Sequence, residues 1–97
     1  MIKMILRDLL KHFNIEESFP EYLLEQSFNK VFLDGELSKS DNTYKIAVTT
    51  RQDVTHQMFL KPDEDYPVII LSELPTGKLN GMKFGRTEGD VKYISQL

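Results

Sequence analysis

The sequence predicts an α+β protein in which an N-terminal αα-hairpin packs on a mainly antiparallel sheet of about five short strands. Two observations predict this class. Apolar residues recur at helical spacing over residues 2–13, and from residue 43 onward they alternate with polar residues, as in half-buried strands. The length of 97 residues suits a single domain, with a helical part at 1–35 and a β-meander part at 43–97.

Residues 2–13 predict the first helix, because their apolar side chains follow the i, i+3, i+4, i+7 pattern of one buried stripe. A second helix is predicted to begin after Ser18, which can form a capping box with Glu21 while Pro20 fits the first turn. Its end stays open, because residues 29–33 fit a helix or a short strand equally well.

The two predicted helices carry charge rows of opposite sign. The basic row and the acidic row are Lys3, Arg7 and Lys11, and Glu17, Glu21 and Glu25. Residues four apart share a helix face, so antiparallel pairing places each base opposite an acid in one common register. A ladder of ion pairs is the simpler interpretation. The alternative is that Glu17, Glu21 and Glu25 bind a basic surface of a partner.

Residues 36–42 lack periodicity and are rich in turn formers, which predicts the main loop. Strands are predicted at 43–50, 54–60, 68–71, 82–87 and 91–95, with a hairpin turn at Asn80-Gly81. The strand Val68–Leu71 is apolar on both faces, as central strands are. Either Val68 and Ile70 face the helices while Ile69 and Leu71 face outward, or the reverse, and the outward pair needs a cover.

The chain contains no cysteine and has a net charge of −3, from 12 basic and 15 acidic residues. Disulfides, thiolate metal sites and thiol catalysis are therefore excluded, and an intracellular location is favoured. The first residues lack the unbroken apolar centre of a signal peptide, and no apolar run approaches the ~20 residues that span a bilayer. We therefore expect a cytoplasmic protein without a membrane partner.

No motif indicates a catalytic chemistry, a metal site or a cofactor. His56 alternates with apolar neighbours, which predicts a half-buried structural histidine without a nucleophile in a known catalytic frame. The acids at 63–65 are consecutive, whereas a calcium loop requires alternating ligands. We therefore expect that the protein is not an enzyme.

One segment suggests a ligand. Gly77–Arg86 combines glycines with Lys78, Lys83 and Arg86, and Phe84 and Tyr93 lie near these bases in the sequence. Backbone N–H groups and cations can hold phosphate while aromatic rings stack bases. The alternative function is therefore a nucleotide-binding or nucleic-acid-binding module that uses the C-terminal hairpins.

The favoured prediction is a non-enzymatic protein–protein interaction module that either self-assembles as a homo-oligomer or acts as an inhibitor or adaptor of a partner protein. An apolar strand that helices cover on one side only leaves a surface that usually marks an interaction site. Lysines outnumber arginines nine to three, as in AT-rich coding, and the size would suit an accessory protein of a phage or mobile element. The expected interface residues are Ile69, Leu71, Glu17, Glu21 and Glu25.

Overall fold

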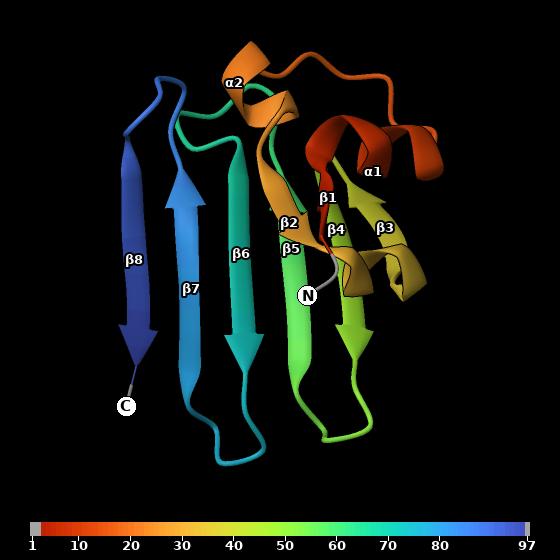
Figure 1. The fold of residues 1–97 in the computed structure, drawn as a ribbon, viewed down its shortest axis with the longest axis vertical. Coiled ribbons are helices and arrows are strands. Elements are labelled where there is room, and N and C mark those ends of the chain that lie inside the picture. Colours follow the sequence, from red (N-terminus) through yellow and green to blue (C-terminus); the bar gives the residue numbers. More distant parts are fainter. Residues whose placement is uncertain (1–2, 97) are drawn as a thin grey trace.

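The computed structural model describes residues 3–96 and confirms the α+β class with a large antiparallel sheet. Six strands lie side by side in sequence order, each antiparallel to its neighbours (Figure 1). They are β3 (Glu36–Ser40), β4 (Thr43–Thr49), β5 (Thr55–Leu60), β6 (Val68–Glu73), β7 (Leu79–Phe84) and β8 (Val91–Gln96).

The prediction of five strands and of a loop at 36–42 is wrong, because residues 36–40 form the edge strand β3. All five residues of β3 are exposed, so the strand has no apolar signature in the sequence. It pairs with β4 along its whole length, and Asp41 adopts a φ of 54° in the two-residue turn between them. Main-chain hydrogen bonds and turn geometry therefore define β3.

The predicted hairpin turn at Asn80-Gly81 is also wrong. Both residues lie inside β7, where Gly81 pairs with Leu71 of β6. The turn between β6 and β7 instead contains Gly77, whose φ of 88° is one that side chains with a Cβ rarely adopt. Leu74 and Lys78 close this turn through a main-chain hydrogen bond of 2.9 Å.

The helical part is more fragmented than the predicted αα-hairpin. Its elements are β1 (Lys3–Ile5), α1 (Leu6–His12), α2 (Glu21–Leu24), β2 (Ser27–Asn29) and the 3₁₀ helix η1 (Lys30–Asp34). The predicted first helix loses its start, because Lys3–Ile5 pairs antiparallel with Ser27–Asn29; residue 2 lies outside the described residues. Residues 29–33, open between helix and strand, end β2 and begin η1.

Local hydrogen bonds explain where α1 ends. Asn14 adopts a φ of 56°, and its N–H donates to Lys11 O at 3.2 Å. The N–H of Ile15 donates to Leu10 O at 2.9 Å, which completes a Schellman motif. The predicted capping box at Ser18 does not form, because α2 begins at Glu21 after Pro20 and has no side-chain cap.

The core lies between the helical part and one face of the sheet. Paired residues in an antiparallel sheet point to the same face, so the strand registers assign every side chain to one of two faces. All buried residues of β4 to β7 share one face: Tyr44, Ile46, Met58, Leu60, Val68 and Phe84. Residues of β2, α1, α2 and η1 cover that face, so the helical layer lies on one side of the sheet (Figure 1).

Candidate protein-binding face of the sheet

The opposite side of the sheet, which we call the open face, has no covering layer among residues 3–96. Its side chains alternate along each strand with those of the core. Its central residues are Lys45, Ala47, Gln57, Phe59, Ile69, Leu71, Glu73, Leu79, Gly81, Lys83, Lys92 and Ile94. The structure therefore places Ile69 and Leu71 on the face that does not contact the helices, and both remain partly exposed.

The strand registers arrange the open face in three rows that cross the strands. The first row is Lys45, Phe59, Ile69, Lys83 and Lys92. The central row is Glu36 at the sheet edge, then Ala47, Gln57, Leu71, Gly81 and Ile94. The third row contains Thr49, Thr55, Glu73 and Leu79. Most of the larger apolar side chains thus lie in the first and central rows, while all three lysines lie in the first row and Glu73 lies in the third.

Gly81 shapes the centre of this face. A Cβ added there would lie 2.3 Å from Ile70 O and 2.6 Å from Leu71 Cδ2. The side chain of Leu71 therefore leans over the space that Gly81 leaves free, and the two strands approach closely at this point. As a result, the open face is shallow and apolar around Gly81.

Tyr66, in the loop between β5 and β6, lies at the basic end of the open face. The Nζ atoms of Lys83 and Lys92 lie 4.5 Å and 6.0 Å from the centre of its ring, which is within cation–π range. A shallow pocket of about 290 Å³ adjoins this contact and is lined by Lys61, Glu64, Asp65, Tyr66, Ile69 and Lys83. The mixed charges of its lining give it no single ligand preference.

The residues predicted to bind a nucleotide or nucleic acid do not lie together. Phe84 is 3% exposed and packs edge-on against Phe28 in the core, so its faces are not accessible for stacking. Lys83 points to the open face, whereas Tyr93 lies on the other face and is 81% exposed. Lys78 and Arg86 flank opposite ends of β7.

Arg86 is hydrogen-bonded to main-chain carbonyl groups within the protein. Its Nη1 donates to the carbonyl oxygens of Pro62 and Glu64, at 3.0 Å and 2.9 Å. These bonds connect the loop after β7 with the loop between β5 and β6. Because the guanidinium is engaged by main-chain acceptors, this arrangement does not support a role for Arg86 in holding phosphate.

The predicted acidic row is engaged within the protein. Arg7 Nη2 lies 2.7 Å from Glu21 Oε1, as the predicted ladder requires, but the same nitrogen also contacts Glu25. Glu17 accepts a hydrogen bond from the Tyr44 hydroxyl at 2.8 Å. The paired carboxylates raise the pKa of Arg7, which stays charged. These three glutamates thus fasten α2 and its preceding loop to α1 and the sheet.

Within residues 3–96, the contact between His56 and Ser72 is the one that resembles a catalytic pair. His56 Nδ1 lies 2.8 Å from Ser72 Oγ, and the Phe32 ring packs edge-on against the imidazole with the ring centres 6.2 Å apart. In the described part of the chain, no carboxylate is hydrogen-bonded to the imidazole to orient it as a general base. Among residues 3–96, no three metal-ligating side chains gather at one point.

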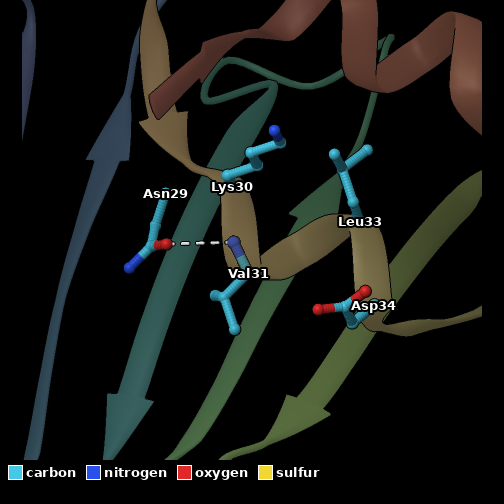
Figure 2. Close-up of a pocket in the computed structure, with 5 residues that line it drawn as sticks. All are labelled: Asn29, Lys30, Val31, Leu33 and Asp34. Atoms are coloured by element: carbon cyan, nitrogen blue, oxygen red, sulfur yellow. Dashed lines mark hydrogen bonds between the residues drawn. The ribbon is translucent and has the colours of Figure 1, made fainter. Parts of the chain in front are cut away.

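Two further pockets lie away from the open face or at its margin. The pocket in Figure 2, of about 380 Å³, surrounds η1 and is lined by Asn29, Lys30, Val31, Leu33 and Asp34. There Asn29 Oδ1 accepts from the Val31 N–H at 2.9 Å and so caps η1. Another of about 380 Å³ lies near the edge of the sheet at Asp34, Glu36, Ala47, Val48 and Thr49.

The sequence reasoning singled out Ile69 and Leu71 but missed their neighbours on the open face. Phe59, Lys45 and Lys92 complete the first row. Their alternation with buried residues was visible in the sequence, but only the strand order shows that they lie beside Ile69.

Comparisons of the chain with protein-family models, with curated proteins and with solved structures found no match. No helix within residues 3–96 has both the length and the apolar character that crossing a bilayer requires.

Proposed function

We propose that this protein is a non-enzymatic interaction module that self-associates through the open face of its sheet. The observation that carries the proposal is the one-sided cover of the sheet. Every buried residue of β4 to β7 points toward the helical part, while Phe59, Ile69, Leu71 and Ile94 remain partly exposed on the other side. A contiguous apolar patch on a soluble domain usually marks a binding surface.

The character of the open face supports a protein surface as its occupant. Its centre is mainly aliphatic and shallow, which suits packing against side chains of another protein. Stacking of bases would need free aromatic faces, but the Tyr66 ring already contacts the ammonium groups of Lys83 and Lys92, and Phe59 is half-buried between neighbouring strands. The pocket beside Tyr66 is small and of mixed charge, so a small-molecule ligand is less well supported.

A second copy is the occupant that the open face fits best. Ala47 and Gly81 in the central row leave room for another sheet to approach to the ~10 Å at which sheets pack face to face. The lysines at one end and Glu73 at the other also let the face complement itself in charge. Packing two such faces together would bury the apolar rows of both copies.

The test measures the mass of the protein in solution. We expect the wild type to sediment as a dimer at about 100 µM, and Ile69→Lys or Leu71→Lys to sediment as a monomer, because each variant buries an unpaired ammonium group in an apolar interface. Leu37→Lys is the matched control. Leu37 is 37% exposed and points to the helix side of edge strand β3, so its variant should remain dimeric.

Circular dichroism of each variant checks that the chain stays folded. A wild type that is monomeric at this concentration, or variants that are folded and remain dimeric, would contradict the proposal. If a single-stranded oligonucleotide instead bound the wild type and lost affinity steeply with salt, the open face would be a nucleic-acid surface.

A further inference from the structure

We infer that the two copies pack their open faces with strands antiparallel across the interface, so that Lys83 of each copy lies beside Glu73 of the other. This inference rests on the proposed self-association and adds its orientation and the residues that determine it. The expected symmetry is a two-fold axis that lies midway between the two sheets. It runs perpendicular to the strands, parallel to the central rows and directly between them.

The positions of the charges along the strands lead to this orientation. Lys83 lies two residues from Gly81 on β7, and Glu73 lies two residues from Leu71 on β6. Gly81 and Leu71 are paired with each other in the central row, so Lys83 and Glu73 lie at equal distances on opposite sides of that row. A two-fold rotation about the row therefore exchanges the basic end of one face with the acidic end of the other.

The resulting contacts are favourable in charge. The first row of one copy, with Lys45, Lys83 and Lys92, would lie over the third row of the other copy. The third row offers two threonines, Leu79 and Glu73 and contains no base. Because β6 and β7 are neighbours about 4.8 Å apart, the long side chain of Lys83 can reach the partner's Glu73.

The other way to align two sheets is opposed by the same charges. Sheets that pack face to face keep their strands within about 30° of a common direction, so the alternative two-fold axis runs along the strands. Rotation about that axis would place the first row of one copy opposite the first row of the other. Three lysines of one copy would then face three lysines of the other. Like charges that face each other across an interface oppose association.

The antiparallel orientation also separates the acidic surfaces of the two copies. Glu17, Glu21 and Glu25 lie on the helical side of the sheet, so they would point away from the interface in both copies. The chain carries a net charge of −3, yet the surface that is buried is basic at one end and acidic at the other. Association thus brings unlike charges together although the two copies have the same net charge.

A charge-swap experiment tests the orientation. Dimer dissociation constants would be measured by sedimentation equilibrium in about 50 mM salt for the wild type, Lys83→Glu, Glu73→Lys and the double variant. We expect each single variant to weaken the dimer about tenfold or more, because two symmetric contacts become repulsive. The double variant should recover most of the loss, since it restores opposite charges at both contacts.

Two exposed charges away from the open face provide controls. Lys78→Glu changes the β6–β7 turn, and Glu88→Lys changes the loop before β8. Each should leave the dissociation constant within about twofold of the wild type. Because Lys83→Glu also removes a contact with Tyr66, recovery in the double variant distinguishes a lost charge pair from local misfolding.

The outcomes separate this inference from the proposed function. If Leu71→Lys abolishes the dimer but the charge variants behave like the controls, the open face is the interface and the inferred orientation is wrong. If Lys83→Glu tightens the dimer, the lysine rows face each other and the axis runs along the strands. A wild type that is monomeric overturns both proposals.

Discussion

Tyr22 of α2 donates a hydrogen bond from its hydroxyl group to the main-chain carbonyl of Gly85, which follows β7. The two residues are 63 positions apart, so this bond joins the helical part to the far half of the sheet. Gly85 has no room for a side chain, because an added Cβ would lie 2.1 Å from Asp90 Oδ2. Burial raises the pKa of Tyr22, and the negative charges of Asp90 and Glu88 raise it further.

Replacing Tyr22 by phenylalanine should remove this link and leave the Gly85 carbonyl without its phenol partner. We expect Tyr22→Phe to lower the free energy of unfolding by about 1 kcal/mol at pH 7. Urea unfolding followed by circular dichroism measures the difference. Tyr66→Phe, which keeps the ring beside Lys83 and Lys92, is the control and should differ little from the wild type.

The stability difference between the wild type and Tyr22→Phe should change with pH in one direction. The pKa of Tyr22 is raised in the folded protein above its ordinary value of 10.0, so folding favours the protonated phenol. Its contribution to stability is complete below that ordinary pKa and is lost as the pH rises through the raised one. Above about pH 10 the wild type should therefore lose stability more steeply than Tyr22→Phe. Equal slopes for the two proteins would contradict this account.

Phe84 and Tyr93, the two aromatic residues of the predicted ligand site, should respond very differently to truncation. Phe84 is 3% exposed and contacts Phe28, so Phe84→Ala should cost about 3–5 kcal/mol of unfolding free energy. Tyr93 is 81% exposed, and Tyr93→Ala should change stability by about 0.5 kcal/mol or less. Chemical denaturation of both variants measures the contrast; similar losses would mean that Phe84 is not part of the core.

Arg7 should couple Glu21 and Glu25 to α1 with small but non-additive effects. Its guanidinium contacts both carboxylates, and all three side chains are substantially exposed. Arg7→Gln should lower stability slightly, and Glu21→Gln by less, because Glu25 still pairs with Arg7. In a double-mutant cycle Glu21→Gln should have no effect once Arg7 is replaced. A full additive loss would show that Glu21 acts through another contact.

The sequence predicted the parts of the fold that depend on apolar periodicity. Strands β4 and β5 lie close to their expected ranges because their apolar and polar residues alternate, and β6 because its first four residues are apolar. Strand β8 also lies close to its expected range. Such apolar patterns are local, so they can be read without knowing which strands are neighbours. The run Val68–Leu71 is apolar on both faces, so the sequence left open which pair faces outward, and the strand registers show that Ile69 and Leu71 do.

The parts that depend on pairing between distant segments could not be predicted in the same way. β1 is a strand because Lys3–Ile5 pairs with Ser27–Asn29, although its apolar residues fit the helical pattern of α1. All five residues of β3 are exposed, so apolar periodicity does not indicate this strand. The rows of the open face likewise arise from the order of the strands, which places Lys83 and Lys92 in one row with Phe59.

The last prediction concerns Gly81, at the centre of the open face, and it opposes the usual effect of glycine replacement. In an unstrained position glycine to alanine stabilises a protein by about 0.4–1 kcal/mol, because the unfolded chain loses conformational freedom. At Gly81 the new Cβ would lie 2.3 Å from Ile70 O, a main-chain atom that can move only if β6 and β7 separate. We therefore expect Gly81→Ala to lower the unfolding free energy by about 1–3 kcal/mol.

The same Cβ would lie 2.6 Å from Leu71 Cδ2, so it should push the Leu71 side chain outward and roughen the open face. Gly81→Ala should thus weaken dimerisation as well as folding, whereas the adjacent variant Asn80→Ala, on the helix side of β7, should affect dimerisation little. Denaturation and sedimentation of the two variants measure both effects. If Gly81→Ala were as stable as the wild type and dimerised as well, then neither the close approach of β6 and β7 nor the shallow centre of the open face would matter for association.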